Sequence, residues 1–178
     1  GAYFDVFPTQ NYPFELNGVF NIDELMFGMY YNIPLQTYAN LISFYVLPEN
    51  DSVNVVMQDI TPNLTAVLGE GTALQYINDG DYWAGTLINL DISSAYWLRM
   101  TDADTLEGNG NSFNPNRVYN LHEGANLVSF PSDGTVDISE GFPNDIEDHI
   151  IAVIGEGEVT SNSVYGWIGS LYNFEGLH

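Results

Sequence analysis

Short apolar runs in which every second residue is apolar dominate the pattern of the chain. Turn-forming residues bound the runs "ANLISFYVL" and "ANLVSF", while "LTAVLG" and "HIIAVIG" are rich in branched residues and end at glycine. The segments "AYWLRM" and "YGWIGSL" are aromatic runs of the same kind. Branched and aromatic residues in short runs between turn formers are typical of β-strands. We therefore expect a chain built mostly of short strands.

Helical patterns are scarce. Asn21–Tyr31 has a possible N-cap at Asn21, Glu24 three residues later, and apolar residues at helical spacing. Val53–Ile60 and Asp137–Phe142 are long enough for single helical turns. The expected fold class is mainly β with short helices.

An internal repeat is the strongest signal in the sequence. "LQTYANLISF" (Leu35–Phe44) matches "LHEGANLVSF" (Leu121–Phe130), and "AVLGEG" (66–71) matches "AVIGEG" (152–157), both 86 positions apart. "WAGTL" (83–87) matches "WIGSL" (167–171) at 84 positions. The pattern predicts two tandem copies of a small β-sandwich-like module.

The repeat divides the chain into four parts. The first copy spans 31–100 and the second spans 119–178. Residues 101–118 are polar and rich in Gly and Asn, which is typical of a linker. Residues 1–30 are interpreted as the closing strand of a preceding or neighbouring module, followed by a connector.

The closing strand of the repeat is found in an unexpected place. The first copy closes with "SAYWLRM" (94–100), the second reaches His178 before its equivalent, and the head of the chain reads "GAYFDVF". The predicted assembly strand therefore consists of Gly1, Ala2, Tyr3, Phe4, Asp5, Val6 and Phe7. Either the sequence is cut from a longer array, or the open second copy accepts the head strand of another subunit. The second alternative predicts a homo-oligomer or polymer with head-to-tail contacts.

These residues carry a resemblance to a known group of repeats. "LHEGANLVSFP", with "AYWLRM" closing the other copy, resembles the "G-x-N-L-I-S … G-Y-W" repeat module of secreted, cell-surface and virion structural proteins of marine bacteria and their phages. The resemblance covers most of the chain from Leu35 onward. It implies an extracellular, β-rich module without catalytic chemistry. Tyr38 departs from the pattern, since the second copy has Gly124 there.

Charge and composition limit the partners. Two basic residues against 24 acidic ones give a net charge of −22, so nucleic acid is not expected to bind. The chain has no Cys and no apolar run long enough to span a bilayer. Screening salt or divalent cations would relieve the self-repulsion of such a surface. These properties fit a secreted, cell-surface or virion location.

Two kinds of candidate site were found outside the strands. Asp102, Asp104 and Glu107 lie near a glycine turn and offer the oxygen ligands that calcium prefers, although their spacing departs from the EF-hand loop. A solvated turn is the competing interpretation. Asn50 and Asn63 begin the sequons "NDS" and "NLT", so both are possible glycosylation sites. Calcium is thus the one possible cofactor, and glycans are possible attachments.

The remaining polar motifs favour a protein that is not an enzyme. Glu70 and Glu156 each lie between glycines, and we interpret both as solvated residues of tight turns. None of the three histidines has a second histidine at metal-binding spacing, and nucleophile and phosphate motifs are missing. Tyr and Trp in matching slots of both copies favour a core role over a repeated sugar site.

The sequence therefore predicts a structural repeat subunit of an extracellular fibre or filament, assembled by strand pairing between successive modules or subunits. Two alternatives stay open. One is a carbohydrate- or surface-binding adhesin module, and the other is a virion fibre or decoration protein. Calcium bridging of the carboxylates would strengthen any of these assemblies.

Overall fold

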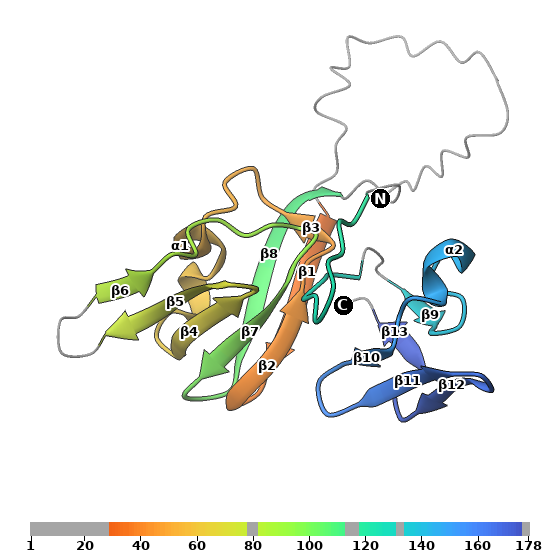
Figure 1. Cartoon of the computed structure of the whole chain (residues 1–178). Coiled ribbons are helices and arrows are strands. Elements are labelled where there is room, and N and C mark those ends of the chain that lie inside the picture. Colours follow the sequence, from red (N-terminus) through yellow and green to blue (C-terminus); the bar gives the residue numbers. More distant parts are fainter. Residues whose placement is uncertain (1–28, 78–81, 113–117, 131–133, 176–178) are drawn as a thin grey trace, which may run out of the picture.

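The structure is a computed structural model that describes residues 29–77, 82–112, 118–130 and 134–175. The first part contains β1 (Met29–Leu35), β2 (Tyr38–Ser43), β3 (Val46–Leu47), α1 (Val53–Val56), the 3₁₀ turn η2 (Gln58–Ile60), β4 (Leu64–Gly69), β5 (Thr72–Ile77), β6 (Tyr82–Gly85), β7 (Ala95–Met100) and β8 (Asp104–Ser112). The second part contains β9 (Thr135–Asp137), α2 (Asn144–Glu147), β10 (Ala152–Ile154), β11 (Val159–Ser163), β12 (Gly166–Gly169) and β13 (Asn173–Glu175). The expected class, mainly β with short helices, is confirmed (Figure 1).

Residues 29–112, called module 1 below, form a sandwich of two antiparallel sheets. One sheet has the strand order β2-β7-β4-β5-β6 and the other has the order β1-β8-β3 (Figure 1). Side chains of both sheets meet in one buried cluster, to which the strands contribute Tyr31, Ile33, Leu35, Ile42, Val46, Leu47, Leu64, Val67, Tyr96, Leu98, Met100 and Leu106. Burial of this apolar surface is the main favourable term in the stability of the module.

Strand β7 is an interior strand of the larger sheet. It pairs with β2 on one side, from Tyr38↔Met100 to Ser43↔Ala95, and with β4 on the other, where Val67 faces Leu98. Tyr96, Leu98 and Met100 point into the core, whereas Arg99 is exposed. Both edges of this strand are therefore hydrogen-bonded, and one of its faces is buried.

Residues 118–175, called module 2 below, repeat part of this architecture. The sheet β10-β11-β12 corresponds to β4-β5-β6, and its register is the same: Ala66 pairs with Gln75, and Ala152 pairs with Ser161. The ladder between β9 and β13, in which Asp137 faces Asn173, corresponds to the Ser52↔Asn89 bridge of module 1. The predicted duplication is thus visible in the described strands of module 2.

The expected linker 101–118 differs from the structure, because residues 104–112 form β8. Leu106 of this strand is completely buried opposite Ile33 of β1. Its glycines allow close packing: a Cβ at Gly110 would lie 2.0 Å from the carbonyl oxygen of Leu47, and one at Gly108 would lie 2.2 Å from the Tyr31 hydroxyl. A segment that looks like a loop from its composition therefore becomes a strand through tertiary contacts.

The expected helices are partly right. α1 and η2 confirm the helical turns predicted over Val53–Ile60. Residues 138–140 form a turn, and the helix α2 follows only at Asn144–Glu147, later than the predicted Asp137–Phe142. Met29–Tyr31, placed in a helix by the sequence pattern, begin strand β1, while Asn21–Gly28 lie outside the described residues.

The glycine of the W-x-G motif is required by its close contact with the neighbouring strand. A Cβ at Gly85 would lie 2.0 Å from the carbonyl oxygen of Ala73, which already accepts hydrogen bonds from Thr86 and Leu87. In module 2 a Cβ at Gly169 would lie 2.1 Å from the carbonyl oxygen of Val159, which accepts the equivalent bonds from Ser170 and Leu171. The W-x-G motif therefore gives the backbone the same course at the end of β6 and at the end of β12.

Replacement Gly85→Ala is expected to lower the free energy of unfolding by about 2–3 kcal/mol, because the methyl group forces the strand away from Ala73. The control Gly71→Ala has a positive φ but nothing within 4 Å of its Cβ. It should cost only about 1 kcal/mol. Urea denaturation followed by circular dichroism measures both, and equal losses would contradict the steric account.

Candidate functional site

The loop before each "ANL" segment is held by an asparagine. Asn40 Oδ1 accepts the backbone N–H of Gln36 at 2.6 Å, and its Nδ2 donates to the Gln36 carbonyl oxygen at 2.8 Å. Asn126 makes the same pair of bonds with His122, both at 2.9 Å. Each loop needs one residue with a positive φ, and this residue is Tyr38 (81°) in module 1 and Gly124 (101°) in module 2. The departure at Tyr38 thus keeps the backbone conformation that glycine adopts more easily.

The two "GEG" turns form a reciprocal contact between the modules. Glu70 Oε2 of module 1 accepts the backbone N–H of Leu127 at 2.7 Å. Glu156 Oε2 of module 2 accepts the backbone N–H of Leu41 at 2.8 Å. Glu156 lies 86 positions after Glu70, and Leu127 lies 86 positions after Leu41. Each module therefore binds the other through the same pair of surfaces, and we call these two bonds the reciprocal clamp.

Glu70 and Glu156 are exposed and lie in a turn and a bend, as the sequence predicted. The structure adds that their carboxylates bind backbone N–H groups of the other module. Hydrogen bonds to a charged acceptor are stronger than neutral ones. The signal in the sequence was the shared 86-residue offset of the "ANL" and "GEG" motifs, although the offset alone does not show that one motif binds the other.

His122 adds a titratable group to one side of the clamp. Its Nε2 contacts Glu70 Oε1, and its Nδ1 lies 2.8 Å from the carbonyl oxygen of Glu123. Both partners are acceptors, so only the doubly protonated imidazolium can donate to both. These contacts raise the pKa of His122 above 6.5, chiefly through the bond to Glu70, and bonds to His122 and Leu127 lower the pKa of Glu70 below 4.5. The counterpart of His122 in module 1 is Gln36, which cannot titrate.

Module 2 has no strand at the position that β7 takes in module 1, as far as the described residues go. β4 pairs with both β5 and β7, whereas its counterpart β10 pairs only with β11 within the described chain. Side chains near this position are accordingly less buried: Ile42 is 2% exposed, and its counterpart Val128 is 45% exposed. Val67 is fully buried, and its counterpart Val153 is half-buried. We call this unfilled place between residues 127–130 and β10 the open position.

The segment beside the open position is anchored to module 1. Val128 forms an isolated antiparallel bridge with Ser94, and the N–H of Ala95 donates to the Leu127 carbonyl oxygen at 3.2 Å. The hydroxyl of Ser129, which is buried, donates to the Ile92 carbonyl oxygen at 2.7 Å. Residues 127–129 therefore meet the residues that lead into β7, as well as the carboxylate of Glu70.

Module 2 has an aromatic cluster of its own. Phe130 stacks on Phe174 with ring centroids 5.0 Å apart, and Phe142 stacks on Trp167 at 5.6 Å. The Trp167 indole N–H donates to Glu147 Oε1 at 2.7 Å. In module 1 the ring of Trp83 contacts Tyr76 at 5.4 Å. These rings contact neighbours within their own module.

The three carboxylates proposed for calcium are not brought together. Asp104 and Glu107 lie three residues apart on β8, so their side chains leave opposite faces of the strand. Asp104 Oδ2 accepts from Asn63, and Glu107 Oε1 accepts from Asn32. Asp102 lies in the exposed bend before the strand. The described residues contain no group of three His, Cys, Asp or Glu placed to hold a metal ion.

The two sequons differ in accessibility. Asn50 is exposed, and its Oδ1 accepts the N–H of Ser52 at 3.3 Å. Asn63 is half-buried; its Nδ2 donates to Asp104 at 2.9 Å, and Thr65 of the same sequon donates to the Arg99 carbonyl oxygen at 2.9 Å. A glycan on Asn63 would remove a bond that the fold uses, so Asn50 is the better candidate of the two.

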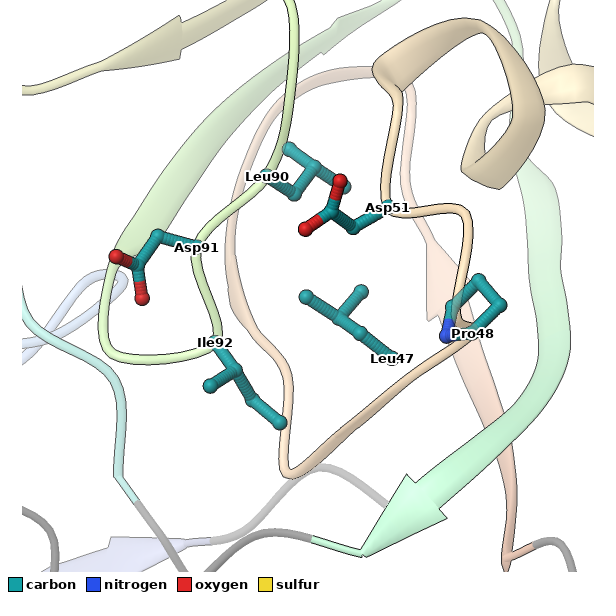
Figure 2. Close-up of a pocket in the computed structure, with 6 residues that line it drawn as sticks. All are labelled: Leu47, Pro48, Asp51, Leu90, Asp91 and Ile92. Atoms are coloured by element: carbon teal, nitrogen blue, oxygen red, sulfur yellow. The ribbon is translucent and has the colours of Figure 1, made fainter.

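A shallow pocket of about 250 Å³ lies between the loop after β3 and the loop before β7 (Figure 2). Its walls include two carboxylates, Asp51 and Asp91. Asp91 Oδ1 accepts both the N–H and the hydroxyl of Ser93, at 2.8 and 2.6 Å. Asp137 makes the same two bonds with Ser139, far from this pocket, and they lower its pKa. The Asp-Ile-Ser sequence is thus a turn-forming motif in both places.

Comparisons with protein-family models, curated proteins and solved structures gave no match to this chain. The resemblance to marine repeat modules therefore stays an expectation. No helix among the described residues has the length and apolar character needed to cross a membrane. The predicted assembly strand, Gly1–Phe7, lies outside the described residues.

The His122 contact is expected to depend on pH in a defined direction. Because folding raises the His122 pKa above 6.5, its contribution is complete below that pH and is lost as the pH rises through the raised value. The Glu70 contribution is present above 4.5 and is lost as the pH falls through its lowered pKa. The contact is therefore strongest between these two pH values.

NMR titration of the His122 ring measures this effect. The midpoint should lie above 6.5 in the wild type and should fall toward 6.5 in Glu70→Gln. The control Glu123→Gln keeps the backbone carbonyl that His122 contacts and should leave the midpoint unchanged. A midpoint that Glu70→Gln does not move would rule out the contact.

The clamp should respond symmetrically to loss of either glutamate. Glu70→Ala is expected to speed hydrogen exchange of the Leu127 amide, and Glu156→Ala that of the Leu41 amide, each roughly 3- to 10-fold. Glu158→Ala, at an exposed neighbouring position, is the control and should change neither amide. If only one of the two glutamates has an effect, the contact is not reciprocal.

Proposed function

We propose that the chain is a non-enzymatic structural repeat unit of an extracellular fibre or filament, on a cell surface or a virion, in which strand pairing between successive modules or subunits completes each β unit. The open position of module 2 carries this proposal. In module 1 the same place is filled by a strand paired on both edges, and its core side chains are buried. Exposed strand edges are the usual sites at which another strand adds to a sheet.

The assignment to a non-enzymatic class is supported by what the carboxylates do. Glu70 and Glu156 bind backbone N–H groups of the opposite module, and Asp91 orders its own turn. Each of these groups has a structural task that is repeated elsewhere in the chain. With 24 acidic and two basic residues, most carboxylates have no basic side chain to pair with, and such a surface suits surroundings that contain screening salt.

The carbohydrate-binding alternative depends on flat rings presented to solvent. Trp83 and Trp167 instead contact Tyr76 and Phe142, and part of their ring surface is covered, which favours the structural interpretation. The expected core role is wrong for Tyr82 and Tyr165, which are 53% and 90% exposed and are the rings that the adhesin alternative would use.

Immunogold labelling of the native material, with antibodies raised against this chain, tests the proposal. Negative-stain images should show labelled filaments with a regular spacing set by the modules. Labelled compact particles without filaments would contradict a fibre role. Soluble polysaccharides, added as a control, should leave the tryptophan fluorescence of the purified chain unchanged, and a saturable change would favour the adhesin alternative.

A further inference from the structure

A second pocket of module 1 lies beside the part of β8 that β3 does not cover. β3 pairs with β8 only at Val46↔Ser112 and Leu47↔Asn111. The turn η2 also packs against β8. The pocket measures about 270 Å³ and is lined by residues of β1, α1, η2 and β8 and by the residue after β3, namely Tyr31, Pro48, Val55, Val56, Gln58, Asp59, Glu107, Gly108 and Asn109.

Tyr31 brings a nearly buried hydroxyl to this pocket. The residue is 5% exposed, its ring packs edge-on against Phe44, and it occupies the space that a side chain at Gly108 would need. The hydroxyl makes no hydrogen bond with the part of the chain that the structure describes, whereas every fully buried polar side-chain atom there has a partner. The small exposed part of Tyr31 therefore includes its hydroxyl oxygen, which reaches the surface in the pocket.

Asp59 of η2 lies close to this hydroxyl. Burial, and after it the carboxylate of Asp59, raise the pKa of Tyr31 above its ordinary value, so the hydroxyl keeps its proton at neutral pH. The Asp59 carboxylate forms neither a hydrogen bond nor an ion pair with any described residue. A hydrogen-bond donor and a charged acceptor thus lie near each other in the pocket, and neither is bound by the described protein.

β8 contributes its backbone edge to the pocket. Leu106 is completely buried, so the side chains of Glu107 and Asn109 leave the opposite face of the strand. Glu107 agrees with this alternation, because its carboxylate accepts from Asn32 at 2.8 Å and both residues are exposed. The edge of β8 that faces away from β1 presents the N–H and C=O groups of every second residue.

These groups define the chemistry of a ligand. The O–H of Tyr31 needs an acceptor, which neither a metal ion nor an ammonium group provides. The carboxylate of Asp59 needs a donor, and it repels anions, as does the net charge of −22. A neutral hydroxyl group both accepts and donates, so two neighbouring hydroxyls of one sugar ring can serve both protein groups. Pro48, Val55 and Val56 form an apolar wall for the C–H groups of such a ring.

We propose that this pocket binds one ring of a neutral saccharide, with one hydroxyl accepting from Tyr31 and another donating to Asp59. The volume lies just below the range of about 300–1,000 Å³ that is usual for drug-sized ligands, so a single ring fits and binds with a Kd of about 1 mM. The site goes beyond the proposed function, because it gives each structural unit a ligand. It is not a repeated aromatic platform: in the described residues of module 2, no strand takes the place of β8.

NMR titration of the full chain with the methyl glycosides of glucose, galactose and mannose tests the proposal. At least one glycoside should shift the Val56 and Gly108 amides along a saturable curve. Methyl glucuronide, which carries a carboxylate, should bind roughly 10-fold more weakly than methyl glucoside. No saturable shift with any of these neutral glycosides overturns the proposal, and so does an equally strong response to glycerol or to the glucuronide.

Tyr31→Phe removes only the hydroxyl. It should weaken glycoside binding at least about 5-fold, because one hydrogen bond to the ligand is lost. The melting temperature should stay within about 2 °C of the wild type or rise, because the hydroxyl has no partner among the described residues. A clear fall would show that the hydroxyl is a structural group and would overturn the proposal. Tyr30→Phe, at the exposed neighbour on the same strand, is the control and should change neither quantity.

Asp59→Asn and Glu107→Gln form a matched pair, because each removes one negative charge. Asp59→Asn should weaken binding at least about 5-fold, and Glu107→Gln, on the other face of β8, by less than about 2-fold. Equal effects would show that binding depends on overall charge, which overturns the proposal. The fibre role is tested separately, since this pocket shares no residue with the reciprocal clamp and no tryptophan lines it. Filaments without glycoside binding would contradict this inference alone, and glycoside binding without filaments would contradict only the fibre role.

Discussion

The whole structure depends on one requirement, which is that a strand inside a sheet must be hydrogen-bonded along both edges. β7 meets it in module 1, where β2 and β4 flank it and its inward side chains join the core. Buried backbone groups without partners are costly, so a sheet that lacks one of its interior strands is incomplete in both bonding and packing. Within the described residues, module 2 has no strand at this place, and side chains buried in module 1 are half-exposed at its equivalent positions.

The second organising feature is the contact that the duplication creates between its own copies. A carboxylate at a tight turn and the backbone N–H of the leucine in "ANL" are complementary, and each module carries one of each. Two copies of such a unit can form both hydrogen bonds with each other, and no further protein is needed. The reciprocal arrangement gives the "ANL" and "GEG" sequences the same structural role in both copies.

The sequence predicted the repeat and the strand class, because these depend on local pattern and on comparison of one copy with the other. It did not predict β8, whose composition of Gly and Asn is typical of a loop. Gly108 and Gly110 lie in a strand because the Tyr31 ring and the Leu47 carbonyl occupy the space of their side chains. The bond from Glu70 to Leu127 spans 57 residues, and nothing local to either residue signals it.

The difference between Gln36 and His122 gives the otherwise symmetric pair a direction. Both modules use the same carboxylate to reach the same backbone amide, but only the Glu70 side is reinforced by an imidazolium. Deprotonation of His122 at alkaline pH would weaken the Glu70 side of the clamp and leave the Glu156 side unchanged. The bond from Leu127 to Glu70 and the backbone bridge between Val128 and Ser94 do not need the imidazolium, so the two modules would stay joined with one reinforcement fewer.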